Sequence, residues 1–152
     1  MKRLGWVVAV SALILTACGM RTVYYHYEHT ELAGWEKLDT LVFNVPKAQE
    51  TSDYGMSLGL RVTGQYPFQR LTLIVERTVY PSHKSEADTI SCRLVTRDGR
   101  MLGHGVNAYQ YTFPVADFSV QEGDSLHITV RHDMKREILP GISDVGIKLT
   151  KH

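Results

Sequence analysis

Several stretches of the 152-residue chain alternate apolar and polar residues with a period of two, and this pattern constrains the fold more than any other feature. Along residues 56–63, Met, Leu, Leu and Val alternate with Ser, Gly, Arg and Thr. A period of two is typical of a β-strand with one buried and one solvated face, whereas an amphipathic helix repeats at about 3.6 residues. The chain from Val23 onward is therefore expected to be all-β.

The alternation predicts about eight strands, over residues 23–27, 40–45, 56–63, 71–76, 90–95, 109–113, 126–131 and 146–150. Turn-forming segments separate them, including Asp98-Gly99, Glu122-Gly123-Asp124 and Leu139-Pro140-Gly141. No long helical pattern lies between the strands, and residues 133–138 are expected to form a loop or one helical turn. Short strands of this kind favour an antiparallel two-sheet β-sandwich, with residues 23–152 as a single domain.

Composition agrees with one ordinary folded domain, because 43% of the residues are hydrophobic and 17 Lys and Arg face 16 Asp and Glu. The basic residues alternate with acidic ones and form no cluster that could follow a phosphate backbone. A nucleic-acid partner is therefore not expected.

The N-terminal residues have the pattern of a signal peptide. Lys2 and Arg3 precede an uncharged, largely apolar stretch over residues 4–17. This stretch is shorter than the roughly 20 apolar residues that a membrane-spanning helix needs, and it ends in small residues. Residues 1–17 are thus expected to be cleaved.

Leu15-Thr16-Ala17-Cys18 resembles the lipobox at which bacterial lipoproteins are cleaved and acylated. Cys18 is therefore the expected lipidation site, and residues 18–22 the tether between lipid and domain. An ordinary secretory signal that happens to end near a cysteine is the alternative. The next residue is Gly19, not the Asp of an inner-membrane retention signal, and no acidic run resembling a surface-export signal follows. The expected location is the periplasmic face of the outer membrane.

Residues capable of catalysis are present, but not in catalytic patterns. No Gly-x-Ser-x-Gly motif exposes a serine nucleophile, and Cys92 alternates in phase with Ile90 and Leu94, which predicts a buried thiol. Seven histidines occur without His-x-x-x-His or Cys-x-x-Cys spacing, and His127 and His132 have opposite parity on one strand. Scattered surface histidines are expected, with no metal site, no cofactor and no enzymatic activity.

Residues 24–29 form an aromatic segment, Tyr-Tyr-His-Tyr-Glu-His, that places Tyr25, Tyr27 and His29 on one strand face. Together with Trp35, Tyr25 and Tyr27 form a candidate binding surface, because Tyr and Trp combine apolar area with a hydrogen-bonding group. The alternative interpretation is packing of these rings on the sandwich. A glycan or a peptide is the kind of ligand that such a surface suits.

The loop over residues 98–105 contains three glycines and ends near His104. It lacks the Gly-Lys-Ser/Thr of a phosphate-binding loop, so its glycines are expected to serve a tight hairpin. Loops often carry binding residues, and His104 is kept as a candidate for the binding surface on that ground.

Short motifs extend along most of the mature chain: Gly34-Trp35, Asp39-Thr40, Phe43, Tyr54, residues 58–61, Tyr66-Pro67, Leu71, Asp88-Thr89, Asp98-Gly99, Leu102-Gly103 and Gly105. The most specific piece is the tail, with Met134-Lys135, Leu139-Pro140-Gly141-Ile142 and Asp144-Val145-Gly146. Together with Cys18, these motifs resemble the GldH family of gliding-motility lipoproteins from Bacteroidetes-type bacteria. Lys135 and Met101 depart from the pattern, since an Arg and a larger aromatic residue are expected there.

The resemblance implies an envelope lipoprotein associated with the gliding apparatus, without catalytic residues. Members also occur in bacteria that do not glide, so an accessory role in a gliding-motility or related envelope complex is the broader expectation. Residues and resemblance together predict a noncatalytic outer-membrane lipoprotein that docks on other envelope proteins. A glycan-binding envelope lipoprotein is the alternative.

Overall fold

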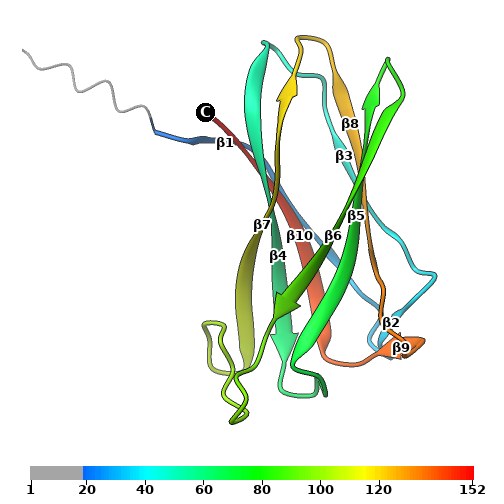
Figure 1. Ribbon diagram of the computed structural model, residues 1–152, viewed down its shortest axis with the longest axis vertical. Coiled ribbons are helices and arrows are strands. Elements are labelled where there is room, and N and C mark those ends of the chain that lie inside the picture. The colour runs from blue at the N-terminus through cyan, green and yellow to red at the C-terminus, as the bar shows by residue number, and fades with distance from the viewer. Residues whose placement is uncertain (1–18) are drawn as a thin grey trace, which may run out of the picture.

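The computed structural model describes residues 19–152 (Figure 1). The predicted signal peptide and Cys18 lie outside the described residues. The first strand begins at Arg21, so only Gly19 and Met20 separate it from Cys18. β1 therefore includes the last two residues of the predicted tether over residues 18–22.

Ten strands make up the described chain: β1 (Arg21–His29), β2 (Trp35–Glu36), β3 (Leu41–Val45), β4 (Ser52–Thr63), β5 (Arg70–Tyr80), β6 (Lys84–Arg93), β7 (Ala108–Val120), β8 (Ser125–His132), β9 (Ile138–Leu139) and β10 (Ile142–Lys151). Eight of them correspond to the predicted strands, and most are longer than the alternation indicated. The two-residue strands β2 and β9 were not predicted, because two residues are too few to show a period.

Two four-stranded sheets form the sandwich (Figure 1). The first sheet has the order β1-β10-β4-β7 and the second the order β3-β8-β5-β6, while β2 and β9 pair in a short ribbon at one end. All strand pairs are antiparallel. The predicted all-β, two-sheet architecture is confirmed.

The core lies between the inner faces of the two sheets. Inward side chains of β4 and β10, such as Leu58, Leu60 and Ile147, face those of β5 and β8, such as Leu73 and Ile128, and all five are fully buried. The predicted burial of Cys92 is confirmed, since its side chain is 0% exposed. Burial raises the pKa of the Cys92 thiol to about 12, so the thiol stays protonated at neutral pH.

One expectation about histidines is wrong. His127 and His132 do face opposite sides of β8, but His132 is completely buried instead of lying on the surface. Its Nε2 atom lies 3.1 Å from the Trp35 carbonyl oxygen, and its Nδ1 atom accepts a hydrogen bond from the backbone N–H of Met134. Burial lowers the pKa of His132, so the neutral imidazole fits this position. Residues 133–137 form a loop rather than a helical turn.

Candidate functional site: the outer face of the first sheet

The outer face of the first sheet carries three rows of side chains that run across β1, β10 and β4. The strand register aligns Tyr25 with Lys148 and Ser57, Tyr27 with Gly146 and Gly59, and His29 with Asp144 and Arg61. Each row therefore combines residues that lie far apart in the sequence. Tyr25, Tyr27, His29, Arg61, Asp144 and Lys148 together are called the Tyr27 face below.

Two glycines hold the ring of Tyr27 flat against the sheet. A Cβ atom on Gly59 would lie 2.5 Å from the Tyr27 hydroxyl oxygen, and one on Gly146 would lie 2.7 Å from ring atom Cε1. No larger residue fits beneath the ring at either position. A glycine inside a strand often marks such a close approach.

Charged and aromatic neighbours hold the ring from the other sides. The guanidinium carbon of Arg61 lies 4.2 Å from the Tyr27 ring centroid, a cation–π arrangement. The hydroxyl oxygens of Tyr25 and Tyr27 are hydrogen-bonded at 3.0 Å, and Lys148 Nζ lies 5.6 Å from the Tyr25 centroid. Burial, followed by the hydrogen bond to Tyr25, raises the pKa of Tyr27 to about 12. The phenol is therefore neutral and able to donate a hydrogen bond.

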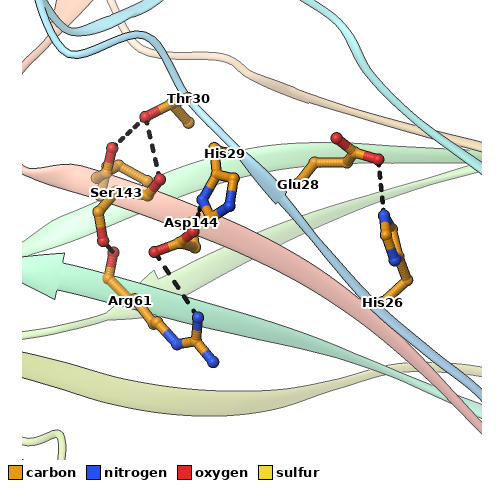
Figure 2. Close-up of polar contacts among 8 residues, drawn as sticks. His26, Glu28, His29, Thr30, Arg61, Ser143 and Asp144 are labelled. Carbon is orange, nitrogen blue, oxygen red and sulfur yellow. Dashed lines mark hydrogen bonds and ion pairs between the residues drawn. The ribbon is translucent and has the colours of Figure 1, made fainter.

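Asp144 forms the centre of the third row (Figure 2). Its side chain is only 10% exposed. Oδ1 contacts Nδ1 of His29, and Oδ2 lies 3.9 Å from Nη1 of Arg61. Apart from the contact with His29, Oδ1 has no hydrogen-bond partner among the described residues. The imidazole that covers this atom is itself 83% exposed.

A β-bulge in β10 lies next to Asp144. Asp144 pairs with Arg61 in the same register as Gly146 with Gly59, and the register with β4 shifts between Asp144 and Ile142, which pairs with Val62. In a regular strand Ile142 and Asp144, two residues apart, would face the same side. The bulge allows Ile142 to be buried while Asp144 lies on the outer face, and bulges that redirect a side chain occur often beside functional sites.

The end of β1 is fixed to this bulge. The backbone N–H of Thr30 donates to the carbonyl of Ser143 at 3.1 Å, and the Thr30 hydroxyl donates to the carbonyl of Ile142 (Figure 2). The Ser143 hydroxyl in turn donates to the carbonyl of Arg61 at 3.1 Å. The backbone around Asp144 is therefore preorganised by three strands.

A groove of about 400 Å³ opens beside this cluster. It is bounded by the end of β1 and the following loop, by the end of β4 and by the bulge of β10. His29, Glu31, Leu32 and Asp144 are among its lining residues. Leu32 is fully exposed at its rim.

The structure brings together two of the four predicted binding residues. Tyr25 is 55% exposed and Tyr27 half-buried, and the predicted shared face with His29 is what the structure shows. Their rings are 5.3 Å apart but inclined at 59°, so they do not form a flat platform. On the opposite face of β1, His26 pairs with Glu28 at 2.8 Å (Figure 2) and contacts Phe43 edge-on.

Trp35 does not belong to this surface. Its side chain is 0% exposed, its ring contacts His132 edge-on at 5.3 Å, and its Nε1–H donates to the carbonyl of Asp39 at 2.8 Å. The ring is part of the core at the β2–β9 ribbon, so it cannot offer a face to a ligand. The packing interpretation is the correct one for this residue.

His104 is exposed, but it lies in the connection between β6 and β7. Its backbone pairs with Gln110 through two hydrogen bonds of 3.1 and 2.8 Å. None of its contacts joins it to Tyr25 or Tyr27. His104 therefore does not form a site together with Tyr25 and Tyr27.

Five contributors to the Tyr27 face were not predicted: Gly59, Arg61, Asp144, Gly146 and Lys148. The sequence holds one indication of this site. Gly59 and Arg61 occupy the polar positions of the alternating run, and a glycine inside a strand often marks the close approach of another group to the backbone. Their pairing with Tyr27 and His29 depends on strand register, which a single sequence does not show.

Within residues 19–152 no group of three or more His, Cys, Asp or Glu residues is placed to hold a metal ion. The same part of the chain contains no helix that is long and apolar enough to cross a membrane.

Comparison with known proteins agrees with the motifs. The family model described as GldH lipoprotein matches residues 22–149. The gliding motility lipoprotein GldH of Flavobacterium johnsoniae is 28% identical over 150 residues, which cover 94% of this chain and 93% of that protein.

Among solved structures, a family 35 carbohydrate binding module from Clostridium thermocellum aligns over 86% of this chain and 95% of its own, with 10% identity and a TM-score of 0.39. The Eiger TNF structure from S. frugiperda aligns over 87% of this chain and 94% of its own, with 11% identity and a TM-score of 0.35. Similarities this low give no basis for a shared ligand. The family match, in contrast, extends over nearly the whole described domain, and this chain belongs to the GldH lipoprotein family.

Proposed function

We propose that this protein is a noncatalytic outer-membrane lipoprotein, anchored through Cys18, which acts in a gliding-motility or related envelope complex by docking on other envelope proteins. The family membership supports the lipoprotein character and the link to gliding motility. The docking mode is supported by the surface chemistry of the Tyr27 face.

The observation that carries the docking proposal is the fixed arrangement of aromatic and charged side chains on the outer face of the first sheet. Tyr25 offers an exposed ring, and Arg61 is already positioned by its stacking on Tyr27. Tyrosine and arginine are enriched at protein interfaces, where they often supply most of the binding energy. Side chains held in place before binding lose less conformational entropy when a partner arrives.

The position of the face relative to the anchor supports the same function. β1 begins three residues after Cys18 and runs from Arg21 to His29, which corresponds to roughly 27 Å at the rise of an antiparallel strand. With the lipid attached at Cys18, the start of β1 would lie close to the membrane. The Tyr27 face would then extend away from it, toward partners in the periplasm.

Outer-membrane attachment rests on the residues around the cleavage site. Gly19 follows Cys18, where an Asp would resemble an inner-membrane retention signal. Several acyl chains on one cysteine attach a protein far more firmly than a single chain does, so the anchor needs no additional basic patch.

Affinity capture tests the docking function. The lipidated protein is recovered from cross-linked, gently solubilised envelopes beside an unrelated lipoprotein, and the bound proteins are identified by mass spectrometry. Specific recovery of secretion or gliding-machinery proteins is expected. It should decrease in Tyr25→Ser and Arg61→Ala, but not in Glu76→Ala, which changes an exposed residue on the other sheet. Recovery of the protein alone would contradict docking.

Glycan binding is the second candidate, and the exposed ring of Tyr25 beside Tyr27 is the observation that favours it. Aromatic rings on an open surface can stack against sugars. Without Trp35, however, the candidate surface consists of two inclined rings. A glycan array with the purified protein and Tyr25→Ser tests this function, and specific binding that disappears in the variant would favour it over docking.

A further inference from the structure

We propose that the groove beside Asp144 accepts a lysine or arginine side chain of a protein partner, with Asp144 as the anion that binds it. This inference rests on the proposed docking function and gives the partner a chemical character.

The carboxylate of Asp144 is nine-tenths buried. Among residues 19–152, the imidazole of His29 is the only polar group in contact with its Oδ1 atom. Burying a carboxylate oxygen without a hydrogen-bond donor costs free energy, because burial removes the water that would otherwise solvate it. The exposed ring of His29 can move away from Asp144 Oδ1. A lysine or arginine side chain, which is a stronger hydrogen-bond donor, can then take its place at this oxygen.

The groove is lined by negative charge. Asp144 and Glu31 are both among its lining residues, and no Lys or Arg of residues 19–152 is. Arg61 approaches Asp144 from outside the groove, at 3.9 Å and on the other carboxylate oxygen. Oδ1 is thus left available for a second cation.

The rim of the groove is apolar. Leu32 is fully exposed beside the groove, and Ile142 forms part of its wall. Lysine and arginine carry long hydrocarbon stems that cover apolar surface while their charged ends reach a polar partner. A cationic side chain entering here would contact Leu32 along its stem and Asp144 at its end.

The geometry favours a charge-assisted hydrogen bond. The bulge and the hydrogen bonds of Thr30 and Ser143 fix the backbone around Asp144, so the carboxylate is already oriented (Figure 2). Hydrogen bonds between an ionised donor and a carboxylate are roughly twice as strong as those between neutral groups.

The test is a titration of the isotope-labelled, lipidated mature protein in detergent micelles, followed by NMR. The probe is n-butylguanidinium, and its neutral isostere n-butylurea is the matched control. Saturable shifts are expected for residues 29–32 and 141–144 with butylguanidinium alone. Absent shifts, or equal shifts with butylurea, would overturn the proposal.

Three variants distinguish loss of probe binding from a change in the fold. Asp144→Asn should bind the probe about tenfold more weakly, as expected when a charged hydrogen-bond acceptor is lost, whereas Asp117→Asn, on the same sheet face, should bind normally. His29→Ala should bind the probe severalfold more tightly, because the imidazole over Oδ1 is removed while the Asp144 carboxylate stays. If the His29–Asp144 contact only stabilised the fold, the variant would show no increase in affinity. Equal affinity in the wild type and Asp144→Asn would overturn the proposal.

The titration also distinguishes this inference from the docking function. If the probe binds as expected but no partner is captured from envelopes, the docking function fails and the cation site stands. If partners are captured equally by the wild type and Asp144→Asn, docking stands and the cation site is excluded from it.

Discussion

The ring of Tyr27 lies so close to Gly59 that a Cβ atom at position 59 would come within 2.5 Å of its hydroxyl oxygen. The contact joins an edge strand to the interior of the first sheet and sets the position of the whole Tyr27 face. It also allows a test of the face with a single added methyl group.

Gly59→Ala should displace the Tyr27 ring outward and lower the free energy of unfolding by about 1 kcal/mol, the low end of the usual effect of overpacking, because the half-buried ring can move. Urea denaturation measures the change. Gly64→Ala is the control, because nothing lies within 4 Å of a Cβ atom at that position. In a Tyr27→Ala background the added methyl group should have little effect; an undiminished loss there would contradict the contact.

The buried imidazole of His132 should make stability depend on pH. Because burial lowers its pKa from 6.5, the unfolded chain takes up a proton below about pH 6.5 while the folded protein does not. The folded state then binds fewer protons, so the free energy of unfolding should fall as the pH drops through this range.

Trp35 provides the signal for this measurement, because it contacts His132 and is the single tryptophan of residues 19–152. Denaturation curves at about pH 7.5 and about pH 5.5 should differ more for the wild type than for His132→Gln. The same pH dependence in both proteins would assign the effect to other groups.

Cys92 should resist alkylation while the protein is folded. Its side chain is fully buried and its pKa is about 12, and only the thiolate reacts. Iodoacetamide should modify it only after unfolding, as followed by mass spectrometry. Ser91→Cys, which adds a thiol at the neighbouring exposed position, should react in the native state. Rapid native labelling of the wild type would contradict the packing.

Cys18→Ala should give a precursor that is neither lipidated nor cleaved at this site. Metabolic labelling with palmitate tests this, with Cys92→Ala as a control that keeps the lipobox and should still be labelled. A lipidated product from Cys18→Ala would contradict the anchor assignment.

The sandwich could be predicted because alternation is a local property, visible within single runs such as residues 56–63. The same parity correctly placed Tyr25, Tyr27 and His29 on one face and Cys92 in the core. The short ribbon of β2 and β9 gave no such signal. The choice between an exposed and a packed Trp35 stayed open in the sequence, because its contact with His132 joins a two-residue strand to the end of β8.

The charged half of the Tyr27 face depends on long-range register. Arg61 and Asp144 meet because β4 and β10 are adjacent in one register, and the bulge between Ile142 and Asp144 lets Ile142 enter the core while Asp144 stays on the outer face. Neither the pairing nor the bulge has a signature in the sequence of one protein. The aromatic half, in contrast, lies on consecutive alternate positions of a single strand.

Site-specific photo-cross-linking in living cells tests the docking claim most directly. A photoreactive phenylalanine analogue replaces Tyr25 on the Tyr27 face or Glu76 on the outer face of the other sheet, both of which are exposed. Docking through the Tyr27 face predicts a discrete cross-linked envelope protein from position 25 and none from position 76. No cross-link at position 25, or the same products at both positions, would contradict it.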